Sequence, residues 1–113
     1  MRKLLAAVAA LMVMAALTTS ALAGAPPVKH ATVDVDGYVY TPGTIKIKRG
    51  TKVVWKWVDG SDVNHNVHVL HGPSTFQSKL MAKGTYSHLF LKAGKYLLYC
   101  TLHPEMRETV IVR

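Results

Sequence analysis

Residues 44–58 read "TIKIKRGTKVVWKWV", two stretches in which apolar and polar side chains alternate on either side of Gly50. The first stretch alternates isoleucines with lysines. The second places Val53, Trp55 and Trp57 on one face. Because successive side chains of a β-strand point to opposite faces, this alternation predicts two half-buried strands with the aromatic face directed inward.

The sequence that follows continues the strand pattern. We expect further strands over 63–70, 85–91, 95–100 and 109–113, separated by turns that contain glycine, proline or aspartate. The exception is 74–83, "STFQSKLMAK", for which we expect a short turn of helix. We expect four aspartates to lie in or beside turns, where their side chains bond the local backbone: Asp34, Asp36, Asp59 and Asp62. Many short strands joined by such turns predict an all-β fold, an antiparallel sandwich or barrel.

The N-terminus has the layout of a secretory signal peptide over residues 1–23. A positively charged start precedes the apolar run 4–17, and Ala21-Leu22-Ala23 forms a small-residue cleavage site. A membrane-spanning helix needs about 20 apolar residues, so we expect cleavage after Ala23 and no stable membrane insertion. The mature chain, 24–113, would then be a single exported, periplasmic domain with a modest core.

The composition favours some classes of partner over others. The formal net charge is +8, and removal of Arg2 and Lys3 with the signal peptide would leave +6. This charge suits an acidic partner or an anionic surface, although it also suits ordinary solubility. The lysines are scattered rather than clustered, so nothing indicates a nucleic-acid partner. The single cysteine, Cys100, has no partner for an internal disulfide, and in an oxidising compartment we expect it to be buried or bound to a metal.

The segment "CTLHPEM" holds the chemistry of the C-terminal part. Cys100, His103 and Met106 are spaced three apart at the end of a predicted strand, so a curled loop could direct all three at one centre. Thiolate, thioether and imidazole ligands together favour copper, and two histidines with a cysteine and a weak methionine form an electron-transfer copper site. The second histidine must come from elsewhere. His65, in a row of valines, is our candidate, against the alternative of a histidine satisfied by a backbone carbonyl.

Together with "YTPGTIKIKRGTKVVWKW" and "HNVH", this loop resembles the cupredoxins, the type I blue copper proteins, and most closely their amicyanin-like, short-loop members. The resemblance covers nearly all of 24–113 and implies a Greek-key β-sandwich with one copper ion. It implies His65, Cys100 and His103 as strong ligands and Met106 as the weak fourth ligand. The neighbouring Asn66 would tie the ligand loops together and donate a backbone N–H toward the thiolate.

Three positions near the ligands depart from the amicyanin pattern, which has histidine, proline and an apolar residue at the places of Tyr99, Leu102 and Glu105. Glu105 places a negative charge near the rim of an otherwise basic protein, so we do not expect this protein to dock with the same partner as its amicyanin-like relatives.

The resemblance implies a monomeric carrier of single electrons, not an enzyme, that cycles between Cu(II) and Cu(I). Its partners would be redox proteins, such as a cytochrome c, a dehydrogenase or an oxidase, that dock at an apolar patch around His103. The alternative is a module that buffers or delivers copper with the same ligands. Zinc fits less well, because a fourth strong ligand is missing. Of the other histidines, His68 should point away from His65 along a strand, so we expect a surface role for it.

Overall fold

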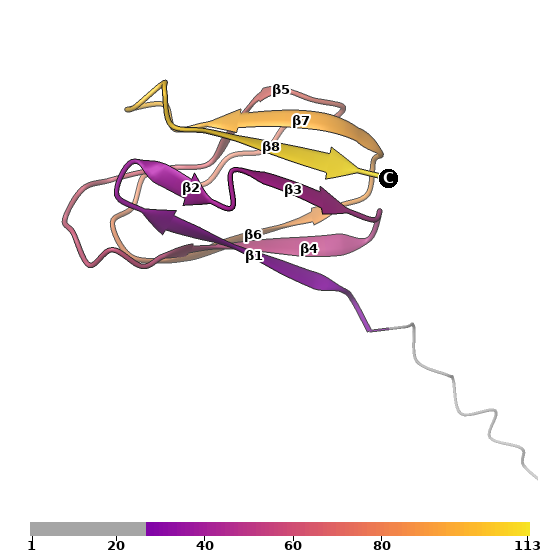
Figure 1. The fold of residues 1–113 in the computed structure, drawn as a ribbon, viewed down its shortest axis with the longest axis horizontal. Coiled ribbons are helices and arrows are strands. Elements are labelled where there is room, and N and C mark those ends of the chain that lie inside the picture. The colour runs from indigo at the N-terminus through magenta and orange to yellow at the C-terminus, as the bar shows by residue number, and fades with distance from the viewer. Residues whose placement is uncertain (1–26) are drawn as a thin grey trace, which may run out of the picture.

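The computed structural model describes residues 27–113, so the predicted signal peptide and its cleavage site lie outside the described residues. The described residues form eight strands and no helix (Figure 1). The strands are β1 (His30–Asp36), β2 (Val39–Thr41), β3 (Thr44–Ile47), β4 (Thr51–Trp57), β5 (His68–His71), β6 (Gly84–Phe90), β7 (Gly94–Tyr99) and β8 (Arg107–Val112). Residues 27–113 contain no helix that is long and apolar enough to cross a membrane.

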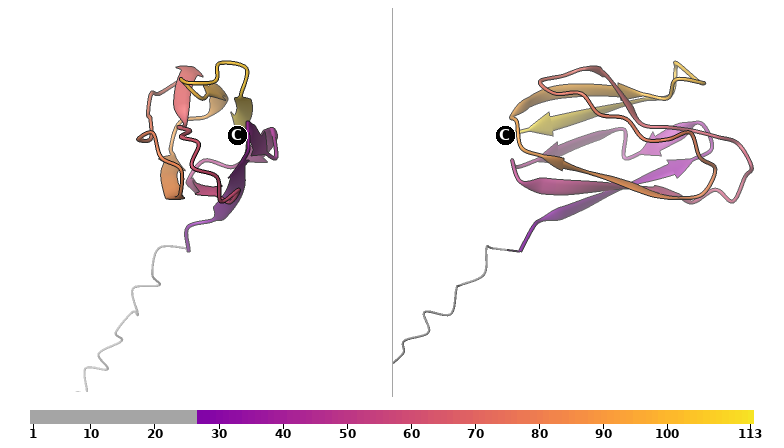
Figure 2. Two further views of the ribbon diagram at one scale, coloured as in Figure 1. Left: turned by 90° about the vertical axis from the view of Figure 1, so that its left-hand side faces the viewer. Right: turned by 180° about the vertical axis from the view of Figure 1, so that it is seen from behind.

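The strands form two four-stranded sheets, ordered β2-β1-β4-β6 and β3-β8-β7-β5, which lie face to face (Figures 1 and 2). The predicted β-sandwich is therefore confirmed. Two pairs, β1 with β4 and β3 with β8, are parallel, while the others are antiparallel. Parallel neighbours need a crossover between them, and here the chain makes it by leaving one sheet for the other.

The core lies between the sheets, and β4 supplies much of it. Val53, Trp55 and Trp57 are buried while Lys56 is exposed, as the alternation predicts. The Trp55 ring lies in a cluster of aromatic side chains from both sheets and the loop between them, formed with Phe76, Tyr86, Phe90 and Tyr96. These rings contribute large apolar area, which is what holds a domain with no disulfide together.

The structure corrects two predicted elements between β4 and β6. The strand expected over 63–70 begins only at His68, and Asn66 is buried together with both of its neighbours, so the side chains do not alternate there. The helix expected over 74–83 is absent. That segment instead runs extended beside 65–69, where Ser78 donates its N–H to the Val67 carbonyl at 2.8 Å. Pairing between the two segments satisfies their backbone groups and overrides the local preference for a helix.

The first strand was not predicted. Val33 and Val35 of β1 are buried in the core, and Asp34 and Asp36 alternate with them on the other face. Asp36 does lie beside a turn, the one at positions 37 and 38, as predicted. The expectation is wrong for Asp34, which lies within the strand because the buried valines set its register. The aspartates at positions 59 and 62 do lie at bends, as predicted.

Candidate metal centre

The loop after β7 is curled by its own backbone hydrogen bonds. The His103 N–H donates to the Cys100 carbonyl at 3.2 Å, and the Met106 N–H donates to the His103 carbonyl at 2.8 Å. The Cys100 N–H in turn donates to the Met106 carbonyl at 3.0 Å, which closes the loop. The spacing of three residues thus becomes two successive turns, and the side chains of Cys100 and His103 meet on one side of the loop.

His65 reaches the same place from the middle of the chain. Its backbone is fixed by two hydrogen bonds to Met81, each of 3.0 Å. Its Nδ1 atom lies 3.2 Å from the Nδ1 atom of His103 and 3.9 Å from the Cys100 sulfur. The third distance, from the Cys100 sulfur to the Nδ1 atom of His103, is 3.6 Å. Sequence reasoning placed these three side chains together, and the structure brings them together.

These three distances define a site of the right size for a metal ion. The point equidistant from the three atoms lies about 2.1 Å from each, within the range of about 2.0–2.3 Å for metal bonds to histidine nitrogen and cysteine sulfur. His65 and Cys100 are fully buried, and His103 is half-buried. Within residues 27–113, this is the only group of three or more histidine, cysteine or acidic side chains close enough to hold a metal.

The donors fit copper chemically as well as geometrically. Burial, together with the neighbouring His103 ring, lowers the pKa of His65, so this imidazole is neutral near pH 7, the form that binds a metal. Its other nitrogen, Nε2, is buried without a hydrogen-bond partner among the described residues. A hydrogen bond between the two Nδ1 atoms would pair the rings, but it would leave the sulfur facing both rings without a role. One soft sulfur with two imidazoles suits copper.

Met106 is buried in the same loop and packs into the core cluster. Its role as the weak fourth ligand stays a prediction.

Asn66 ties the two ligand segments together. Its side-chain oxygen accepts the Thr101 N–H at 2.8 Å and lies 3.2 Å from the Thr101 hydroxyl, which also donates to it. Its backbone carbonyl accepts a hydrogen bond from the buried Tyr40 hydroxyl. The predicted tie is confirmed, and it fixes the segment that holds His65 to the residue next to Cys100. The predicted N–H donation toward the thiolate stays a prediction.

Tyr38 is a site residue that sequence reasoning missed. Its ring stands edge-on to His103, with centroids 4.6 Å apart, and to His65 at 5.5 Å, while 56% of its surface is exposed. The turn before it is held by Asp59, whose carboxylate accepts the Gly37 N–H at 2.9 Å. No local pattern marks Tyr38, because only the pairing of β1 with β2 brings it over the two imidazoles.

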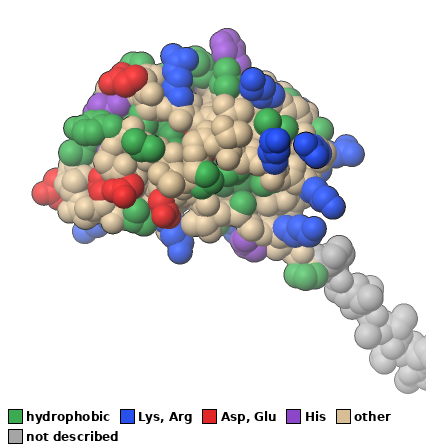
Figure 3. Space-filling view, viewed as in Figure 1, with side chains coloured by type: hydrophobic (Ala, Val, Ile, Leu, Met, Phe, Trp, Pro, Cys, Tyr) green, Lys and Arg blue, Asp and Glu red, His purple; other side chains and the backbone are tan. Residues whose placement is uncertain are grey.

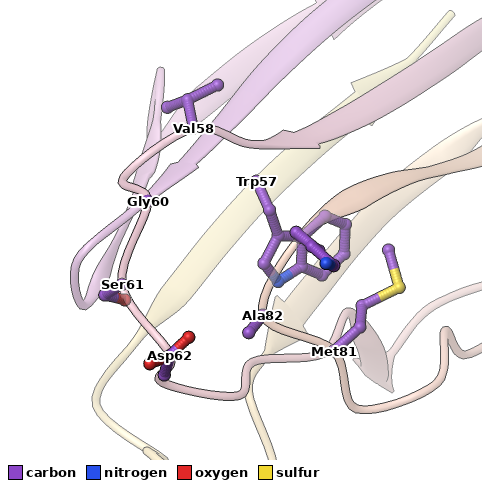
Figure 4. Close-up of a pocket in the computed structure, with 8 residues that line it drawn as sticks. Trp57, Val58, Gly60, Ser61, Asp62, Met81 and Ala82 are labelled. Carbon is purple, nitrogen blue, oxygen red and sulfur yellow. The ribbon is translucent and has the colours of Figure 1, made fainter.

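A solvent-open hollow of about 600 Å³ lies beside the centre (Figure 4). Its wall includes Trp57, Asp62 and Met81, and Met81 is the residue whose backbone pairs with His65. The Trp57 indole nitrogen is buried without a hydrogen-bond partner among the described residues. The residues that line the hollow include no cysteine or histidine, so it is distinct from the metal centre.

His68, on β5, makes contacts of its own. Its Nδ1 atom lies 3.0 Å from the Val69 carbonyl oxygen, and its ring stands edge-on to Tyr99 at 5.5 Å.

An all-β sandwich with one buried cysteine and two histidines, one of them on a short C-terminal loop, defines a blue copper type of protein. The family model for the cupredoxin-like domain matches residues 7–112, and the chain belongs to the cupredoxin family. The resemblance predicted from the sequence is therefore confirmed.

Two curated relatives are amicyanins. The chain is 34% identical over 90 residues to amicyanin of Paracoccus versutus, which covers 76% of this chain and 67% of that protein. It is 32% identical over 113 residues to amicyanin-alpha of Methylorubrum extorquens, covering 95% and 93% respectively.

Solved structures of cupredoxins also resemble this fold. The crystal structure of amicyanin from Paracoccus versutus has a TM-score of 0.65 and 34% identity, covering 77% of this chain and 84% of that chain. A methionine-to-glutamine variant of amicyanin, solved with Cu(I), has a TM-score of 0.65 and 31% identity, covering 74% and 82%. A purple cupredoxin from Nitrosopumilus maritimus has a TM-score of 0.64 and 25% identity, covering 74% and 99%.

Proposed function

We propose that this protein is a blue copper electron carrier that binds one copper ion through His65, Cys100 and His103, with Met106 as a weak fourth ligand. The observation that carries this proposal is the convergence of one sulfur and two Nδ1 atoms on a point about 2.1 Å from each, a metal-bond distance. Copper, when bound, supplies a one-electron couple. The amicyanin structures to which the chain is similar include oxidised and reduced forms.

The protein's own part is to hold the ligands still and to keep water away from them. The hydrogen bonds that close the loop and the tie through Asn66 fix the positions of the ligand atoms. Burial of Cys100 and His65 excludes water from the thiolate side. A site that changes little between two oxidation states suits repeated transfer of single electrons. We therefore infer a carrier rather than an enzyme.

His103 provides the route for electrons, because it is the only one of the three converging side chains that is partly exposed. Exposed apolar side chains lie beside it, including Tyr38 and Leu102. Redox proteins, such as a cytochrome c, a dehydrogenase or an oxidase, would dock on this patch for a short time.

Loading with Cu(II) tests the proposal. We expect one copper per chain, an intense blue thiolate-to-copper band and reversible reduction with the metal retained. Cys100→Ser should lose the blue band, because serine provides no thiolate. A colourless centre, or one that releases copper on reduction, would contradict the electron carrier and favour copper buffering or delivery. Export through residues 1–23 would place this activity in the periplasm.

A further inference from the structure

The charges of the protein are divided between its two ends. The end opposite the metal centre carries eight lysines and arginines and no aspartate or glutamate: Lys29, Lys46, Lys48, Arg49, Lys52, Lys92, Lys95 and Arg113. All six aspartates and glutamates lie elsewhere in the fold: Asp34, Asp36, Asp59, Asp62, Glu105 and Glu108. We call the first group the basic end. Figure 3 shows acidic side chains on the left of the molecule and most of the basic ones on the right.

Backbone hydrogen bonds show that the basic end is a single surface. The Arg49 N–H donates to the Arg113 carbonyl at 2.9 Å, and the Lys52 N–H donates to the Lys29 carbonyl at 2.8 Å. The Gly50 N–H donates to the Phe90 carbonyl at 2.7 Å, which brings the turn that follows β6 to the same place. Residues from both sheets, from the connections at 48–50 and 91–93 and from the two ends of the described chain therefore contribute to one basic surface.

Two aliphatic side chains protrude among these cations. Leu91 is 67% exposed and Val28 is 48% exposed. Beside Val28 lies a hollow of about 340 Å³ whose wall includes Lys29, Lys48 and Arg49. Exposed aliphatic side chains surrounded by lysine and arginine are typical of surfaces that bind membranes, where the cations meet anionic headgroups and the aliphatic groups enter the interface.

We propose that the basic end binds the surface of an anionic phospholipid membrane and directs the copper end away from it. An acidic redox protein is a poorer occupant, because it would sit at the end of the molecule farthest from the metal centre. Membrane binding does not depend on the proposed electron transfer, so either could fail without the other.

Vesicle binding provides the test. The copper-loaded protein should co-sediment with phosphatidylglycerol–phosphatidylcholine vesicles at low salt, and much less with pure phosphatidylcholine or at high salt. The triple variant Lys48→Glu/Arg49→Glu/Lys92→Glu should bind the anionic vesicles at least about a hundredfold more weakly than wild type. Its matched control, Lys56→Glu/Lys79→Glu/Lys83→Glu, makes the same change in net charge outside the basic end and should bind within about threefold of wild type.

No binding to the anionic vesicles at low salt would overturn the proposal, as would equal loss in the two triple variants, which would mean that net charge alone matters. Orientation is tested by NMR of the Cu(I) protein on nanodiscs that carry a gadolinium lipid. The amide signals of Leu91 and Lys92 should broaden more than those of Leu102 and Glu105. The reverse pattern would show that the copper end faces the lipid.

Discussion

Glu108 places a carboxyl group on the inward face of β8, where only 2% of its surface is exposed. One oxygen accepts a hydrogen bond from the Trp55 indole at 2.8 Å, and the other has no partner among the described residues. Burial raises the pKa of Glu108 to about 8, because the opposing effect of the Trp55 hydrogen bond is smaller. The group is therefore a neutral acid at pH 7.

The raised pKa predicts how stability depends on pH. The unfolded chain releases this proton near pH 4.5 and the folded protein only near pH 8, so Glu108 lowers the free energy of unfolding progressively as the pH rises between these values. Glu108→Gln should remove this slope and stabilise the protein at pH 9 by about a few kcal/mol. Urea unfolding at pH 5 and pH 9 measures the effect. Equal pH dependence in the variant and the wild type would contradict it.

Asn66 carries a second prediction at this scale. Asn66→Ala removes the side-chain oxygen that accepts the Thr101 N–H. The free energy of unfolding should fall by about 1–3 kcal/mol, and copper should be lost faster. Thr101→Val is the control. It removes only the 3.2 Å hydroxyl contact, so it should cost about 1 kcal/mol or less. Urea unfolding and copper transfer to a chelator provide the measurements, and equal effects of the two variants would refute the tie.

Some site residues can be predicted from residue type and spacing, and others cannot because their role depends on long-range contacts. The set of His65, Cys100 and His103 was found because a thiol and imidazoles are rare side chains, and their pattern here is one that metal binding requires and core packing does not. Tyr38 was missed because its contact with the histidines depends on long-range pairing. The inward position of Glu108 was not predicted either, because the last strand was expected only from position 109 and the Trp55–Glu108 bond spans 53 positions.

At the scale of elements, alternation was a reliable signal wherever a strand packs one face on the core. The strands β3, β4, β6, β7 and β8 follow the predicted ranges to within two residues or so. The signal failed between β4 and β6, where the predicted ligand His65 and the buried Asn66 follow each other directly. There, backbone pairing with Ser78 and Met81 and the hydrogen bond between Asn66 and Thr101 set the conformation, and these long-range contacts leave no local pattern in the sequence.

The start of β7 provides a prediction for an element, because Gly94 approaches Pro73 closely. A Cβ atom added to Gly94 would lie 2.5 Å from the Pro73 Cγ atom, and the backbone there has a φ of 141°. Gly94→Ala should therefore destabilise the protein by about 1–3 kcal/mol. In the control Gly43→Ala, the nearest atom is 3.8 Å away, an ordinary contact, and we expect a smaller loss. Equal thermal midpoints for the two variants would contradict this account.

At the scale of the whole molecule, the sandwich separates two surfaces that the net charge alone does not distinguish. From composition, a basic protein suggests an acidic partner. The fold instead gathers most of the cations at the end away from the metal centre and leaves Glu105 and the turn aspartates nearer to it. Net charge is a sum over the chain, so the division between the ends could be known only from the topology.

Copper should stabilise the whole fold, because it joins the middle of the chain to the C-terminal loop and binds only when both are in place. At copper concentrations of about 1,000 times the dissociation constant, the gain would be about 4 kcal/mol. Calorimetry of the copper-loaded and copper-free protein should show a clear rise in the midpoint of unfolding with copper. Cys100→Ser should show a much smaller rise, and a full rise in this variant would contradict the ligand assignment.

The most direct measurement is X-ray absorption at the copper edge of the Cu(II)-loaded protein. Our account predicts one sulfur and two nitrogen atoms around copper, at about 2.0–2.3 Å, with the sulfur lost in Cys100→Ser. A copper shell that contains only nitrogen and oxygen atoms would contradict the account.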